Sequence, residues 1–294
     1  MALKLIATDM DGTLLTDEDK SFDRQLFDQL LSQMNRLGIM FVVASGNQYQ
    51  KLRQYMDGFH GRGISYIAEN GAYIADDEGD ILLSGFNPET VGEIVAVLAD
   101  FPHIGYLISG HQGSYLPRER AEPITALMRE HLDFLGAEFP RDLNYVSFIN
   151  QFYPGVQVID SLEDIGQDLV VKFALQTRRR DLDVVLEQLV DRLPKQAVPV
   201  ASGFGAIDLV SRGVNKGSAL KWFGQQRGID PADMLAFGDN SNDLEMLQLV
   251  GEGVAVDNAI PAVKAAAQTV IGTNHDGAVL TYLAAKLAEL EKQG

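Results

Sequence analysis

The segment DMDGT at 9–13 holds two carboxylates one residue apart, directly after the apolar run 3–8. Alternate residues of an extended chain point to the same side. We therefore expect Asp9 and Asp11 to present their carboxylates together at the C-terminal end of a buried strand, where α/β sheets bind ligands. Gly12 would allow a sharp turn there. An acidic turn without chemistry has the same composition, so this segment alone leaves both interpretations open.

A second acidic loop, GDNSND at 238–243, follows the apolar run 234–237. The oxygens of Asp239, Asn242 and Asp243 are ligands that suit a hard cation. The alternative is an Asx-rich loop that only caps the next helix, which Asp243 could do. Two carboxylate-rich loops at strand ends of one sheet can converge on one ion. Together they predict a metal site.

Two further features indicate an anion at the same edge. Ser45 and Gly46 follow the apolar run 39–44, and a hydroxyl with an approachable N–H could hold phosphate oxygens. Lys216 opens a predicted helix, where a cation opposes the helix dipole, so an anion is expected nearby. A plain strand-to-helix turn and a surface lysine are the respective alternatives.

Composition restricts the partners. The chain of 294 residues has 24 Lys and Arg against 41 Asp and Glu, a formal charge of −17, and no cysteine. Such a surface repels nucleic acid and anionic membranes, and disulfides and thiolate metal sites are excluded. No apolar run reaches the roughly 18 residues of a membrane span, and the start has no signal-peptide pattern. We expect a cytoplasmic protein that acts on a small molecule, without a nucleic-acid or membrane partner.

The elements that must position these residues alternate between strand and helix. A helix is predicted over 22–37, capped by Gly38, and strands over 3–8, 39–44, 64–68, 234–237 and 253–256. This alternation predicts an α/β fold, a Rossmann-like doubly wound parallel sheet. The segment 84–211 has helical patterns and short strands but no chemistry-bearing cluster. We predict a discontinuous core, 1–83 and 212–294, with 84–211 as an inserted α+β cap domain that sets substrate specificity.

The order of DMDGT, Ser45, Lys216 and GDNSND resembles the four motifs of the haloacid dehalogenase (HAD) superfamily of phosphohydrolases. The large insert is similar to the cap of the Cof-type subgroup, subclass IIB. The stretches ENG, NHDGAV, VVASGNQY and SGFGAIDL also look like that subgroup, the last two like its bacterial sugar phosphatases. Two stretches depart from the usual pattern. At 45–47 the chain has Ser-Gly-Asn where Thr-Gly-Arg is usual, a change that would affect contacts with phosphate or substrate. Asp257 stands before Asn258 where Gly is usual, on a loop that we expect to be peripheral.

The resemblance implies a mechanism. Asp9 would attack phosphorus and form an aspartyl phosphate. Asp11 would protonate the leaving alkoxide and then deprotonate the hydrolytic water. The metal would be Mg²⁺, held by Asp9, the backbone carbonyl of Asp11 and Asp239.

The remaining motif residues would bind the phosphate or support the site. The phosphate ligands implied by the resemblance are Ser45, Gly46, Lys216 and Asn242, while Asp243, and also Asn242, would support the metal. The substrate expected is a small phosphorylated metabolite, above all a sugar phosphate.

Other activities remain compatible with the sequence. A phosphomutase or phosphotransferase would use the same residues with a sugar hydroxyl in place of water. A non-catalytic sensor of phosphorylated metabolites could use the same pocket, although the intact set of acidic residues and Lys216 disfavours it. The physiological substrate and the choice between monomer and homo-oligomer are left open.

Overall fold

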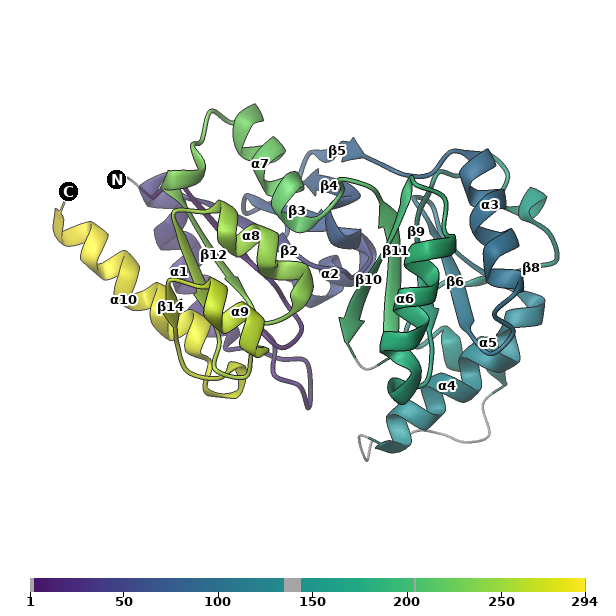
Figure 1. The fold of residues 1–294 in the computed structure, drawn as a ribbon. Helices are drawn as coiled ribbons and strands as arrows, with labels where there is room; N and C mark the ends of the chain where they lie inside the picture. Colours follow the sequence, from purple (N-terminus) through teal and green to yellow (C-terminus); the bar gives the residue numbers. More distant parts are fainter. Residues whose placement is uncertain (1–2, 135–143, 204, 294) are drawn as a thin grey trace. The chain divides into compact units, whose positions relative to one another are not determined.

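The computed structural model describes residues 3–134, 144–203 and 205–293, which form two compact units (Figure 1). The core unit consists of Met1–Leu82 and Gly213–Gly294, and the inserted unit is Leu83–Arg212. These units begin and end one residue from the boundaries expected from the sequence. The part that the inserted unit plays in specificity stays a prediction.

Within the described residues, the core unit contains an eight-stranded sheet of order β14-β13-β12-β1-β2-β3-β4-β5. Its strands are β1 (Leu5–Thr8), β2 (Met40–Ala44), β3 (Ile64–Ala68), β4 (Tyr73–Asp76), β5 (Gly79–Leu83), β12 (Met234–Gly238), β13 (Glu252–Ala255) and β14 (Thr269–Val270). All pairs from β14 to β3 are parallel, whereas β4 runs antiparallel to β3. The predicted doubly wound parallel sheet is therefore confirmed. The extension through β4 and β5 was not expected.

Helices alternate with the parallel strands of the core unit, and the last helix follows the last strand. They are α1 (Arg24–Leu37), α2 (Tyr49–Tyr55), α7 (Lys216–Gln226), α8 (Leu244–Leu249), α9 (Pro261–Ala266) and α10 (Ala278–Gln293). In α1 the Asp23 side chain accepts the N–H of Leu26, and Gly38 ends the helix in the left-handed region at φ 70°. The helix expected over 22–37 thus begins two residues later and ends as expected.

Parallel pairing aligns the ends of the three strands that precede the motifs. Thr8 of β1 lies opposite Phe237 of β12 and Val43 of β2. Because parallel strands share one direction, the residues that follow β1, β2 and β12 emerge at the same edge of the sheet. All four residues of β1 are buried, so hydrophobic packing on both faces holds the strand that leads into Asp9.

The described part of the inserted unit contains a six-stranded sheet of order β10-β11-β9-β6-β7-β8, mostly antiparallel. Its elements are α3 (Pro88–Ala99), β6 (Gly105–Gly110), β7 (Ser114–Pro117), α4 (Ala121–Phe134), α5 (Tyr145–Ile149), β8 (Gln157–Ile159), β9 (Val170–Gln176), α6 (Leu182–Arg192), β10 (Ala197–Gly203) and β11 (Ala206–Ser211).

Helices cover both faces of this second sheet. Phe173 belongs to a hydrophobic cluster that includes Ile94 of α3 and Leu189 of α6, whereas Ala174, the next residue along β9, belongs to a second cluster that includes Ile124 of α4 and Phe148 of α5. Consecutive residues of a strand point to opposite faces, so the inserted unit has two separate hydrophobic clusters. It has a core of its own, as an independent domain requires.

No helix in the described residues is both long and apolar enough to cross a membrane.

Candidate active site

Lys216 lies at the centre of a buried ion cluster. It is the first residue of α7, whose N-cap Asn215 accepts the N–H of Ser218. The Lys216 Nζ atom lies 2.6 Å from Asp9 Oδ1 and 2.6 Å from Asp243 Oδ1, and the lysine side chain is 0% exposed. The alternative of a surface lysine is therefore wrong. The anions expected near this helix start are two carboxylates of the chain itself.

Asp243 is held on both of its carboxylate oxygens. It ends the single 3₁₀ turn η6 (Ser241–Asp243), which follows β12. Its Oδ1 faces Lys216, and its Oδ2 accepts the backbone N–H groups of Asp239 and Asn240, each at 3.0 Å. A Cβ at Gly238 would lie 2.5 Å from the Asp243 Cβ, so this position requires glycine. The carboxylate therefore fixes the loop and the ammonium group together.

Asp239 faces the DMDGT segment. The hydroxyl of Thr13 donates to Asp239 Oδ1 at 2.9 Å, and a Cβ at Gly12 would lie 2.7 Å from Asp239 Oδ2. Gly12 also has φ 81°, in the region that favours glycine. One oxygen each from Asp9, Asp239 and Asp243 lie within 4.8 Å of one another. This group has the chemistry of a site for a divalent cation with oxygen ligands.

The cluster holds three carboxylates, Asp9, Asp239 and Asp243, and the ammonium group of Lys216. This excess of negative charge shifts the pKa values of its members. Burial raises the pKa of Asp9 well above its ordinary value; Lys216 opposes the rise, and the Asp243 and Asp239 carboxylates add to it. Burial and the Asp243 carboxylate raise the pKa of Asp239 to about 7. The pKa of Lys216 is raised as well, because Asp243 and Asp9 outweigh the effect of its burial. Either a proton or a metal cation would relieve the excess negative charge.

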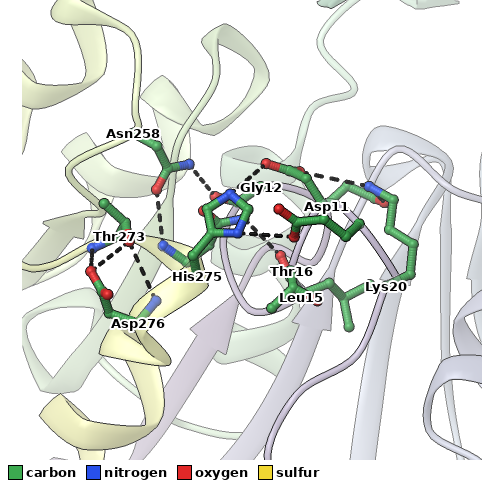
Figure 2. Close-up of polar contacts among 12 residues, drawn as sticks. Asp11, Gly12, Leu15, Thr16, Lys20, Asn258, Thr273, His275 and Asp276 are labelled. Atoms are coloured by element: carbon green, nitrogen blue, oxygen red, sulfur yellow. Dashed lines mark hydrogen bonds and ion pairs between the residues drawn. The ribbon is translucent and has the colours of Figure 1, made fainter. Parts of the chain in front are cut away.

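Asp11 has a different set of partners. The Lys20 Nζ atom lies 3.0 Å from Asp11 Oδ1, a contact that Figure 2 shows, and the amide of Asn47 donates to Asp11 Oδ2. Burial alone would raise the pKa of Asp11. The ammonium groups of Lys20 and Lys51 and the hydrogen bonds from Lys20 and Asn47 outweigh it, so the pKa is lowered. The two carboxylates of DMDGT thus have opposite pKa shifts.

Ser45 follows β2 at the same sheet edge and is buried. Its hydroxyl oxygen accepts the N–H of Asn47 at 3.1 Å, and its carbonyl accepts the N–H of Asn70 at 3.0 Å. The Asn70 side chain then accepts from the amide of Asn242 at 2.9 Å, and a Cβ at Gly46 would lie 3.0 Å from the same Asn70 oxygen. The turn ENG thus joins Ser45 and Gly46 to Asn242. The phosphate-binding role of these residues stays a prediction.

Two amides near the C-terminus hold the DMDGT turn, and sequence reasoning missed them. Asn258 donates to the Gly12 carbonyl at 2.7 Å, as Figure 2 shows. Asn274 donates its N–H to Asn258 Oδ1 at 3.0 Å and its amide to the Leu15 carbonyl at 2.9 Å. The expectation of a peripheral loop was therefore wrong at Asn258. It does fit Asp257, whose carboxylate pairs with Lys264 at 2.8 Å with 62% of the Asp257 side chain exposed.

Comparisons with known proteins agree with this arrangement. The family model of haloacid dehalogenase-like hydrolases matches residues 6–283. The 5-amino-6-(5-phospho-D-ribitylamino)uracil phosphatase YbjI of Escherichia coli K12 is 30% identical over 96% of each chain. A structure of SMU.1108c from Streptococcus mutans UA159 has a TM-score of 0.84 at 29% identity, covering 98% of this chain and 100% of that one. A subclass IIB sugar phosphatase shares the fold, with a TM-score of 0.72 at 20% identity, covering 96% and 98%.

The family match spans nearly the whole chain and includes every motif residue that meets in the core unit. The chain therefore belongs to the haloacid dehalogenase-like hydrolase family, and it is a phosphatase.

Proposed function

We propose that the chain is a Mg²⁺-dependent phosphomonoester hydrolase that works through an aspartyl phosphate on Asp9. The observation that carries this proposal is the buried Asp9 carboxylate, bound by the Lys216 ammonium 2.6 Å away and grouped with Asp239. A carboxylate is a weak nucleophile towards a phosphate dianion because like charges repel. A fixed cation on one of its oxygens and a metal ion on the other would offset that repulsion.

The donor atoms of this chain fit Mg²⁺. Asp9, Asp239 and the backbone carbonyl of Asp11 would hold the ion, all through oxygen, as Mg²⁺ prefers. Asp243 is occupied by Lys216 and two backbone N–H groups, so we assign it to support. When bound, Mg²⁺ supplies positive charge to the transferring phosphoryl group.

The chain's own residues would carry the two chemical steps. Asp9 forms a bond to phosphorus while the bond from phosphorus to the leaving oxygen breaks, and Asp11 gives that oxygen its proton. In the metal-free chain the pKa of Asp9 is raised and that of Asp11 is lowered, so these roles need the charges of the bound ion and substrate: the cation would keep Asp9 ionised, and the phosphate dianion would favour the protonated form of Asp11. Asp11 then takes a proton from water, whose oxygen attacks phosphorus and releases inorganic phosphate from Asp9. The Ser45 hydroxyl, the Gly46 N–H, Asn242 and Lys216 would hold the phosphoryl oxygens, where catalysis is mainly positioning and electrostatics.

We propose sugar phosphates and related polyol phosphates as the substrate class. Two relatives, YbjI of E. coli and YitU of Bacillus subtilis, bear the name 5-amino-6-(5-phospho-D-ribitylamino)uracil phosphatase. YitU is 25% identical over 95% of this chain and 96% of its own. The ester in that compound lies on a ribityl chain, so its leaving group is an alkoxide that requires a proton donor. The inserted unit would choose among such substrates through its own side chains.

A substrate panel tests the proposal. The purified chain is incubated with Mg²⁺ and with hexose phosphates, pentose phosphates, the ribitylaminouracil phosphate and 4-nitrophenyl phosphate, and inorganic phosphate and isomerised sugar are both measured. We expect stoichiometric phosphate release, loss of it in excess EDTA, and no isomerised product. Isomerised sugar without phosphate release would overturn the hydrolase proposal in favour of a phosphomutase, and no turnover of any ester would favour a sensor.

A further inference from the structure

The turn at 257–260, which follows β13, contacts both segments that carry the candidate metal ligands. The amide of Asn258 donates to the Gly12 carbonyl at 2.7 Å, as Figure 2 shows. Two residues later, the N–H of Ile260 donates to the Asp239 carbonyl at 3.0 Å. This turn therefore holds the DMDGT turn and the GDNSND loop in one arrangement relative to each other.

The Asn258 amide is itself held in one orientation. Its Oδ1 accepts the N–H of Asn274 at 3.0 Å, so its NH₂ group faces the Gly12 carbonyl. Asn274 is only 1% exposed, and its own amide donates to the Leu15 carbonyl at 2.9 Å. The two asparagines thus bind the DMDGT turn and the chain that follows it at two separate carbonyls.

The backbone at Gly12 needs such a contact. Glycine has no Cβ to restrict its backbone torsions, and Gly12 has φ 81°. The Asp11 carbonyl, the proposed backbone ligand of Mg²⁺, belongs to the peptide bond that precedes Gly12. A hydrogen bond to the Gly12 carbonyl fixes the next peptide bond and so restricts rotation about Gly12. The orientation of the Asp11 carbonyl relative to Asp239 therefore depends on Asn258.

We propose that Asn258 is a positioning residue that holds the Asp11 carbonyl and the Asp239 carboxylate rigidly enough to favour Mg²⁺ over Ca²⁺. This inference rests on the proposed function, in which these groups hold Mg²⁺. Oxygen ligands bind both ions, but Mg²⁺ requires a nearly ideal octahedron at about 2.0–2.1 Å, whereas Ca²⁺ accepts variable geometry at about 2.3–2.6 Å. Loosening the DMDGT turn should therefore weaken the binding of Mg²⁺ more than that of Ca²⁺.

The affinities of Asn258→Ala for the two ions test the proposal. Thermal unfolding of the full chain without substrate, followed across titrations of MgCl₂ and CaCl₂, gives a Kd for each ion. We expect the Kd for Mg²⁺ to rise about tenfold, as for other residues that orient metal ligands, and the Kd for Ca²⁺ to change less than about threefold. The Mg²⁺ concentration for half-maximal turnover should rise in parallel, while kcat at saturating Mg²⁺ stays within about threefold.

Two further variants accompany Asn258→Ala. Asp257→Ala changes the adjacent residue of the same turn, whose side chain is 62% exposed and pairs with Lys264, and it should bind both ions as the unmodified chain does. Asn274→Ala removes the contact with Leu15 and should shift the Kd for Mg²⁺ in the same direction as Asn258→Ala. Asn258 is exposed, so its variant should fold, and urea unfolding in EDTA checks this. Should it fail to fold, Asn274→Ala decides the outcome.

The outcomes separate this inference from the proposal on which it rests. If the unmodified chain binds Mg²⁺ and needs it for turnover, but Asn258→Ala binds both ions unchanged or both equally more weakly, the positioning role is wrong and the proposed function stands. A loss of kcat that saturating Mg²⁺ does not restore would also contradict the positioning role. An unmodified chain that neither binds Mg²⁺ nor needs it for turnover overturns both.

Discussion

Each unit of the molecule contains a buried lysine beside aspartate, but the two sites differ in charge. In the core unit, Lys216 lies 2.6 Å from both Asp9 and Asp243. In the inserted unit, Lys172 lies 3.5 Å from Asp208, and both side chains are less than a tenth exposed. The first site gathers more carboxylates than cations, whereas the contact described at the second joins one lysine to one aspartate. Only an excess of negative charge calls for a further cation, so the difference separates a candidate metal site from an ion pair.

The candidate metal site lies in the core unit. Among the described residues, the group of acidic side chains near enough to share one ion is Asp9, Asp239 and Asp243, all in the core unit. The inserted unit adds two packed hydrophobic clusters. We infer that chemistry and substrate choice are separate properties of the two units, and the following predictions test that separation.

The largest effect is expected from Lys216→Met. The variant leaves Asp9 and Asp243 buried without their cation, which costs about 3–5 kcal/mol of stability, and it removes a fixed charge from the proposed nucleophile. Turnover of 4-nitrophenyl phosphate should fall at least about 100-fold. Urea unfolding and steady-state kinetics measure the two effects.

Lys172→Met is the matched variant in the inserted unit. It also breaks a buried pair, so the free energy of unfolding should fall, but turnover of 4-nitrophenyl phosphate should stay within about threefold, a barrier change below ~1 kcal/mol. Equal losses of turnover in the two lysine variants would show that the units do not divide the work in this way.

A pH effect of intermediate size is expected in the metal-free chain. Burial and the Asp243 carboxylate raise the pKa of Asp239 from 3.8 to about 7. Between these values the folded chain binds a proton that the unfolded chain has released. The free energy of unfolding should therefore fall as pH rises from about 4 to about 7, by up to a few kcal/mol at roughly 1.4 kcal/mol per pKa unit. Asp9, whose pKa is also raised, acts in the same direction.

Urea unfolding in EDTA across this pH range measures the effect, with Asp239→Asn as the control that should reduce it to the part that Asp9 contributes. Adding Mg²⁺ should stabilise the chain more at about pH 8 than at about pH 5, since Mg²⁺ competes with the proton. A stability that rises steadily across the window in EDTA would contradict the charge imbalance inferred for the core unit.

The smallest change in rate, and the clearest change in selectivity, is expected from exchanging the inserted segment. Residues 84–211 are replaced by the corresponding segment of YbjI. The ranking of phosphate esters should follow the donor of the segment, while turnover of 4-nitrophenyl phosphate stays similar, because the proposed catalytic residues all lie in the core unit. A folded chimera that keeps the original ranking would refute the proposed role of the inserted unit.

Strand–helix alternation predicted much of the core because its signals are local. Apolar runs identified β1 and β3, and Gly38 marked the end of α1. The strands β4, which is antiparallel to β3, and β5 were missed, since their pairing depends on tertiary contacts rather than on a periodic pattern. The motif residues Asp9, Asp239 and Lys216 were recognisable because each follows a strand or opens a helix.

Other parts of the candidate site were not predictable from the sequence. Asn258 reaches Gly12 across 246 positions, and Asn47 reaches Asp11 across 36. An isolated Asn or Lys has many surface roles, so type and spacing did not single out Lys20 either. The backbone of Lys20 lies in the left-handed region, and that loop has no glycine or asparagine from which such a turn could be predicted. Only the folded chain shows that these donors meet the DMDGT segment.

The account depends most on Asp9 as the site of phosphorylation, and chemical trapping tests this directly. The chain is mixed with Mg²⁺ and excess 4-nitrophenyl phosphate, quenched during turnover and treated with borohydride, which reduces an aspartyl phosphate to homoserine. Peptide mapping by mass spectrometry should find homoserine at position 9, absent without substrate and absent in Asp9→Asn, which should be folded and inactive. Turnover by Asp9→Asn within about tenfold of the unmodified chain, a barrier change of only ~1.4 kcal/mol, would contradict the covalent mechanism, as would homoserine at a different aspartate.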